Sequence, residues 1–186
     1  MKTAITSAIA TVIAITGCTV PVRVGDNAHR VFHGSLNFTQ EERTSIESAM
    51  DRMREQTSGA VQYDVVWDGE GNAFNTLNVF EVAPDGYDMH TMGHAGGNSG
   101  HVDIFFVRTE MKSITSEPYA NVVRYVALHE MTHAVGVYEH LKQGLMTTIA
   151  TLPLLQCIDN VTMVELQKHV SIPEPIPCDI PATPSP

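Results

Sequence analysis

Three residues in the stretch HEMTHAVG have the types and spacing of a metal-dependent hydrolase site. His129 and His133 are four residues apart, so both imidazoles would share one face of a helix and could hold one ion. Glu130 lies beside His129, where its carboxylate could reach a water on the metal rather than the metal itself. Zinc would lower the pKa of that water toward about 7, and Glu130 would take its proton as general base and deliver it to a leaving amine. These residues therefore predict zinc-dependent hydrolysis of an amide bond.

The residues around this motif argue against two incidental histidines on a helix surface. The motif lies in the strongly apolar run VVRYVALHEMTHAVGV, where buried histidines would need partners for their ring nitrogens. Gly136 follows His133 by three residues and would end the helix, so that the chain can turn back toward the ion. The tripeptide GLM (144–146) follows soon after.

With these residues the chain resembles the metzincin clan of zinc endopeptidases, whose pattern is HExxHxxGxxH followed by a methionine turn. The matching residues are His129, Glu130, His133, Gly136 and Met146. The resemblance implies that Met146 lies beneath the zinc without binding it. It also implies an endopeptidase that uses Zn²⁺ as its cofactor and acts on proteins or peptides. The stretch after Met146 is similar to that of matrix-metalloproteinase-like members.

The resemblance further implies an α+β fold over residues 30–170, with a twisted mixed β-sheet, two main helices, the methionine turn and a short C-terminal helical subdomain. The periodicity of the chain agrees with this order. It predicts strands at 30–38, 60–68, 75–83 and 101–107, and helices at 40–57, 116–136 and 161–169. Thr39 and Glu42 form a capping-box pattern at the start of the first helix. The glycine-rich residues 84–100 predict a long loop.

The third zinc ligand departs from the family pattern. The last histidine of that pattern would fall at position 139, which is Glu139 here, and His140 comes one residue later. We favour His140, because a loop absorbs one extra residue at little cost and a third neutral ligand keeps the ion more acidic. Glu139 stays an alternative, since zinc accepts carboxylate oxygen. Glu165 on a later helix is a third candidate, in the arrangement of thermolysin-like enzymes.

Two further sites follow from the resemblance. In metzincins an edge strand above the active-site helix pairs with an extended substrate, and HVDIFFV (101–107) is the segment most similar to it. Its apolar residues equally suit a plain core strand, and the two interpretations are compatible. The residues before and at the start of this strand include Asp88, His90, His94 and His101, in a region where matrix metalloproteinases bind structural zinc and calcium. The His-x-Asp element of that family is not matched in order. Solvated loop histidines are therefore the preferred interpretation, with a second metal site as the alternative.

The first 17 residues have the form of a secretory signal peptide. Lys2 is followed by an uncharged apolar run that is too short for a stable membrane span. The run ends in ITGC (15–18), which is similar to the lipobox of bacterial lipoproteins and implies that Cys18 carries a lipid. An ordinary signal peptide cleaved nearby is the alternative. We expect an exported protein, lipid-anchored to the membrane of a bacterial cell envelope, with residues 18–29 as its tether.

Two cysteines lie near the other end of the chain. In an oxidising compartment Cys157 and Cys178 are expected to form one disulfide, with two buried free thiols as the alternative. Residues 171–186 contain too many prolines for helix or sheet and are interpreted as a C-terminal tail.

Length and charge narrow the class of protein. The 186 residues are 43% hydrophobic, enough for one compact domain with a core. The net charge of -10, without a basic stripe, argues against a nucleic-acid partner, and we expect a monomer.

The hypothesis for the function of the chain is a zinc endopeptidase. Its alternative is a non-catalytic envelope lipoprotein that uses a structural zinc site for binding or assembly, although such a site has no use for Glu130 as a base.

Overall fold

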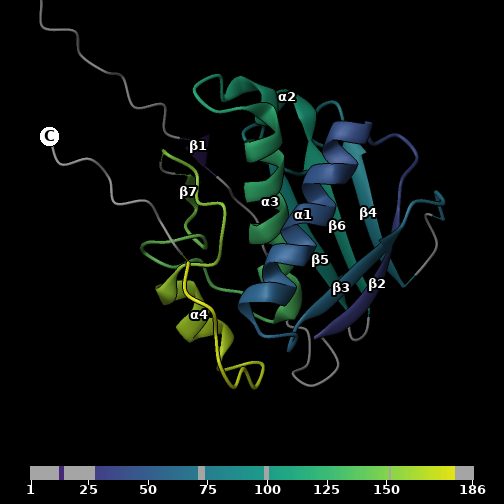
Figure 1. The fold of residues 1–186 in the computed structure, drawn as a ribbon. Helices are drawn as coiled ribbons and strands as arrows, with labels where there is room; N and C mark the ends of the chain where they lie inside the picture. Colours follow the sequence, from purple (N-terminus) through teal and green to yellow (C-terminus); the bar gives the residue numbers. More distant parts are fainter. Residues whose placement is uncertain (1–12, 15–27, 71–73, 99–100, 151, 179–186) are drawn as a thin grey trace, which may run out of the picture.

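The described part of the chain has an α+β fold, with a five-stranded mixed sheet and four helices (Figure 1). A computed structural model describes residues 13–14, 28–70, 74–98, 101–150 and 152–178. The α+β class expected from the sequence is present.

The five-stranded sheet carries its one antiparallel strand at an edge. Its strand order is β3 (Gln62–Val66), β2 (His29–Gly34), β4 (Asn75–Phe80), β6 (His101–Val107) and β5 (Gly93–Asn98). The first four strands pair in parallel, and β5 pairs antiparallel with β6. A separate short pairing joins β1 (Ile13–Ala14) to β7 (Ile149–Ala150).

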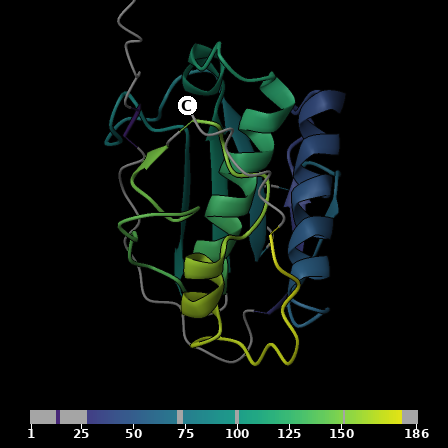
Figure 2. The same ribbon diagram turned by 60° about the vertical axis from the view of Figure 1, so that its left-hand side comes forward.

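Helices α1 (Gln40–Gln56) and α3 (Tyr119–Val135) lie side by side on one face of the sheet, as Figures 1 and 2 show. Alternate residues of β6, such as Ile104 and Phe106, enter the buried core beneath them. On the opposite face Val31 and Val66 are about half exposed, at 48% and 47%. The core therefore lies between the sheet and these two helices.

The first helix begins where the capping box predicts. The Glu42 amide donates to the Thr39 hydroxyl at 3.3 Å, and the Glu42 carboxylate accepts from the Thr39 amide at 2.7 Å. The helix ends before Ser58 and Gly59, whose φ angles are +50° and +80°. Left-handed backbone of this kind stops a helix.

Three expectations for the middle of the chain need correction. Residues 84–100 are not a loop throughout, because β5 lies within them. The segment 101–107 is not an edge strand: it is β6, which lies between β4 and β5. A short helix, α2 (Arg108–Ser113), follows β6 and was not expected. The sequence of β5, GHAGGN, has low strand propensity, so its pairing with β6 and its packing on α3 decide its conformation.

The C-terminal part is tied to α1. A disulfide joins Cys157 and Cys178, the pair expected from the sequence, with Cα atoms 5.6 Å apart. The Ile176 amide donates to the Gln56 carbonyl at 2.9 Å. Between the two cysteines lies α4 (Asn160–Leu166). The start of the proline-rich tail therefore packs against the body of the protein.

The predicted export signal lies largely outside the described residues. Cys18, most of residues 1–17 and nearly all of the predicted tether belong to that part, so the lipid anchor stays a prediction. Within the described ranges, no helix has both the length and the apolar character needed to cross a bilayer.

Candidate metal centre

Three histidine side chains converge at the C-terminal half of α3. The Nε2 atom of His129 lies 3.1 Å from that of His133 and 3.2 Å from that of His140. One ligand atom from each residue lies within 4.8 Å of the others. His129 and His133 are buried, and His140 is partly buried. The i,i+4 spacing on α3 supplies the first two, as the sequence predicts.

The loop after α3 decides which residue joins them. Gly136 caps the helix with a φ of +129°, and the chain then turns back to the site. The Leu141 amide donates to the Met146 carbonyl at 2.6 Å, which fastens the residue next to His140. Glu139 is exposed and lies outside the cluster. Glu165 instead pairs with Lys168 at 2.6 Å.

Backbone carbonyls orient the two helix histidines. The Nδ1 atom of His129 lies 2.8 Å from the Leu145 carbonyl, and that of His133 lies 2.5 Å from the Val137 carbonyl. A ring nitrogen that faces a carbonyl must carry the proton, so each Nε2 is left as a lone-pair donor. Both Nε2 atoms therefore present the form that binds a metal.

Burial favours the uncharged form of all three imidazoles. It lowers the pKa of His129 to about 4, against a smaller opposing effect of the Leu145 carbonyl. Burial also lowers the pKa of His133 well below its usual range and lowers that of His140. Neutral imidazoles are the ligands that zinc needs. Tetrahedral zinc with nitrogen ligands at about 2.0–2.1 Å would separate those nitrogens by about 3.3 Å, close to the distances present. The donor set fits zinc.

Glu130 is a buried carboxylate without a hydrogen bond. Its side chain has no exposed surface, and neither carboxylate oxygen has a hydrogen-bond partner. Burial raises the pKa of Glu130 to about 8. The nearby backbone amide of Ala95 lowers that pKa by a smaller amount, although it does not have the geometry of a hydrogen bond to the carboxylate. Leaving a buried polar group unpaired costs about 1–3 kcal/mol. A cation held by the neighbouring histidines would favour the ionised form of this side chain.

The remaining candidate ligands from the sequence do not come together. His90 lies 3.6 Å from Glu110, and His101 lies 2.9 Å from Asp103. His94 is buried on β5 and packs against the rings of Tyr87 and Phe105. Within the described ranges these three histidines form no common group. His94 is therefore not the solvated loop residue that was expected.

A second group of possible ligands was missed in the sequence. His33 at the end of β2, together with Asp68 and Glu70 in the turn after β3, brings three ligand atoms within 4.8 Å of one another. The Nδ1 atom of His33 lies 2.7 Å from Asp68 Oδ2. The DGEG turn was the signal in the sequence, but only the pairing of β2 with β3 brings His33 to it.

The chain matches no protein-family model and no curated protein.

Proposed function

We propose that the protein is an exported zinc endopeptidase of metzincin type, with Zn²⁺ held by His129, His133 and His140 and Glu130 as its general base. The observation that carries this proposal is the buried, unpartnered carboxylate of Glu130 beside three converging imidazoles. A buried carboxylate without a hydrogen bond destabilises the folded protein when no metal is bound. Proteins keep such destabilising groups mainly at functional sites.

Zinc held by His129, His133 and His140 would supply Lewis acidity, which would make a water molecule more acidic and would polarise the carbonyl of a scissile bond. Glu130 accepts the proton of the attacking water at its carboxylate and then donates it to the leaving amine. Val126, one helical turn before Glu130, is buried beside Gly93 as Glu130 is, so the carboxylate lies in an apolar surrounding. The Leu145 and Val137 carbonyls hold the two helix histidines in orientation.

The position of β5 supports a peptide as substrate. This strand is the antiparallel edge of the sheet, and it packs against α3. A strand edge offers backbone groups that an extended peptide can pair with, and side-chain pockets can then select residues. We therefore assign pairing with the substrate to β5 instead of segment 101–107. Gly93 of β5 lies beside Glu130.

The alternative, a non-catalytic lipoprotein with a structural zinc site, is less well supported. A structural site needs the three histidines and a fourth ligand or water. It gains nothing from a buried carboxylate beside them.

The change Glu130→Gln tests the proposal. We expect zinc content to stay at the wild-type level and peptide cleavage to fall by about 10²–10⁴-fold, the usual contribution of a general base. Exposed Glu139→Gln is the matched control and should change neither property. If wild-type protein binds zinc but cleaves nothing in a broad peptide library, or if Glu130→Gln cleaves normally, the endopeptidase proposal fails.

Lipid anchoring through Cys18 is a separate part of the proposal. It rests on the ITGC sequence and predicts that Cys18→Ser loses membrane association and the added mass of the lipid. Membrane fractionation with intact-mass measurement checks it. Unchanged membrane association in this variant would contradict it.

A further inference from the structure

The carboxylate of Asp159 binds the backbone of Leu145, the residue whose carbonyl faces a ring nitrogen of His129. Asp159 Oδ2 accepts the Leu145 amide at 2.6 Å. The carbonyl of the same residue, Leu145, accepts from His129 Nδ1 at 2.8 Å. The hydroxyl of Tyr125 also donates to this carbonyl, at 3.4 Å. One residue thus links Asp159 to a candidate metal ligand.

The same carboxylate is fixed from its other side. Asp159 is the N-cap of α4, and its Oδ1 accepts from the amides of Val161 and Thr162 at 2.9 and 3.1 Å. Its Oδ2 also accepts from the Thr162 hydroxyl at 2.8 Å. A Cβ at Gly144 would lie 2.5 Å from both carboxylate oxygens. Only glycine leaves room for Asp159 there, and it also suits the φ of +87° at that position.

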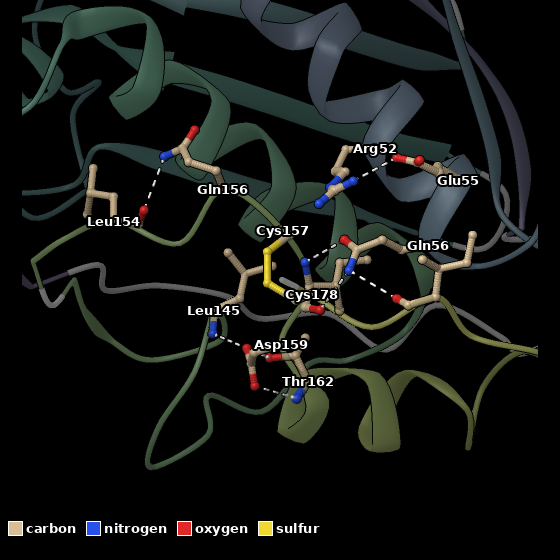
Figure 3. Close-up of a disulfide and its surroundings, with 12 residues drawn as sticks. Arg52, Glu55, Gln56, Leu145, Leu154, Gln156, Cys157, Asp159, Thr162 and Cys178 are labelled. Atoms are coloured by element: carbon tan, nitrogen blue, oxygen red, sulfur yellow. Dashed lines mark hydrogen bonds and ion pairs between the residues drawn. A yellow bond between two sulfur atoms is a disulfide. The ribbon is translucent and has the colours of Figure 1, made fainter. Parts of the chain in front are cut away.

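The segment before Asp159 is anchored to α1, as Figure 3 shows. Ile158 donates its amide to Gln56 Oε1 at 2.7 Å, and its carbonyl accepts from Gln56 Nε2 at 3.0 Å. Gln56 is fully buried. The Cys157–Cys178 disulfide links the same segment to the C-terminal stretch, where the Ile176 amide also donates to the Gln56 carbonyl. Asp159 therefore has neighbours on both sides that leave it little freedom.

From these contacts we propose that Asp159 is a positioning residue for the metal centre, and that Gln56 and the Cys157–Cys178 disulfide hold it in place. The inference rests on the proposed metal binding by the three histidines. Ligands of metals are commonly oriented by such outer contacts, and losing one costs about 10–100-fold in metal affinity.

Two substitutions separate positioning of the metal ligand from capping of α4. Asp159→Asn keeps an N-cap, because asparagine caps helices as well as aspartate does. It places an amide N–H₂ where Oδ2 accepts the Leu145 amide, so that two donors face each other. Thr162→Val removes the other bond to Oδ2 and leaves the Leu145 bond intact.

We expect Asp159→Asn to bind zinc about 10–100-fold more weakly than wild type, measured by competition with a chromophoric chelator. Its cobalt(II) visible spectrum should also differ, because that spectrum reports the geometry of the ligands. Thr162→Val should keep both wild-type properties. The melting temperatures of the metal-free proteins show how far each change destabilises the fold. Wild-type zinc affinity in Asp159→Asn, or an equal loss in Thr162→Val, would overturn the positioning role.

The anchor is tested by the double change Cys157→Ser/Cys178→Ser and by Gln56→Ala. Both variants should bind zinc more weakly than wild type, in the same direction as Asp159→Asn. Thr39→Ala, which removes the cap of α1 at its far end, is the destabilised control and should bind zinc normally. Wild-type affinity in both anchor variants would overturn the anchoring role. If wild-type protein itself bound no zinc, the proposed function would fail, whereas normal zinc binding by Asp159→Asn refutes this inference alone.

Discussion

Gly93 on the edge strand approaches Glu130 on α3 so closely that a Cβ at position 93 would lie 3.1 Å from Glu130 Oε1. This Cβ at position 93 would also lie 2.5 Å from Val126 Cγ1, which is closer than two non-bonded carbon atoms approach in a packed protein. The helix therefore packs directly on the backbone of β5. This contact places the candidate general base beneath the strand proposed to pair with substrate.

The change Gly93→Ala tests that contact. The added methyl group must displace Val126 or Glu130, and overpacking of this kind costs about 1–3 kcal/mol. We expect lower kcat for peptide cleavage with zinc content unchanged, because the nearest atoms to the added methyl group belong to Val126 and Glu130 and not to a histidine. Gly59→Ala is the control: its φ of +80° strains alanine, yet its ideal Cβ lies no closer than 3.7 Å to any other group. Normal kcat in Gly93→Ala would contradict the prediction.

The identity of the third ligand gives a second prediction. His140→Ala should lose zinc on dialysis, because among the described residues only His140 adds a third ring nitrogen to His129 and His133. Glu139→Ala should keep one zinc per chain, since Glu139 is exposed and outside the cluster. Metal analysis of the two proteins decides between them. Zinc loss in Glu139→Ala with retention in His140→Ala would reverse the assignment.

Acid stability is expected to depend on Glu42. Burial raises the pKa of this carboxyl, but hydrogen bonds from Arg108, the Thr39 amide and Tyr119 outweigh burial and lower it to about 2. A folded-state pKa below the unfolded value stabilises the fold above pH of about 4.5, and this contribution is lost as pH falls toward about 2. The shift corresponds to at most about 3 kcal/mol.

The measurement is urea unfolding of wild type and Glu42→Gln between those two pH values. The difference in unfolding free energy between the two proteins should shrink as pH falls. Because other carboxylates titrate in both proteins, the difference isolates Glu42. A difference that stays constant across the range would show that this carboxyl does not titrate with the expected shift.

Met146 gives a prediction about the chain segment that follows the three histidines. Its side chain is fully buried, and its carbonyl accepts from the Leu141 amide beside His140. Met146→Leu conserves volume and should cost less than about 1.5 kcal/mol, with zinc retained. Met146→Ala leaves a cavity and should cost about 2–5 kcal/mol. Zinc loss in Met146→Leu at unchanged stability would instead indicate that the thioether contributes to the metal site.

Agreement between sequence and structure is closest where local rules apply. The α1 cap depends on two residues three positions apart, and Thr39 and Glu42 make the predicted bonds. The strand at 101–107 has the predicted bounds, but its neighbours in the sheet could not be predicted from its own residues. The strand β5 was missed because glycine has little intrinsic preference for a strand. Its conformation comes from pairing with β6 and from the close approach of α3.

The same division applies to the candidate metal centre. The sequence by itself determined that His129 and His133 share a helix face with Glu130 beside them, because helical geometry fixes those positions locally. Only the tertiary structure decided that His140, rather than Glu139, completes the cluster. That choice depends on the path of the loop after Gly136, which the Leu141–Met146 hydrogen bond holds. Likewise, only folding brings Asp159 to Leu145, since that contact joins segments fourteen residues apart.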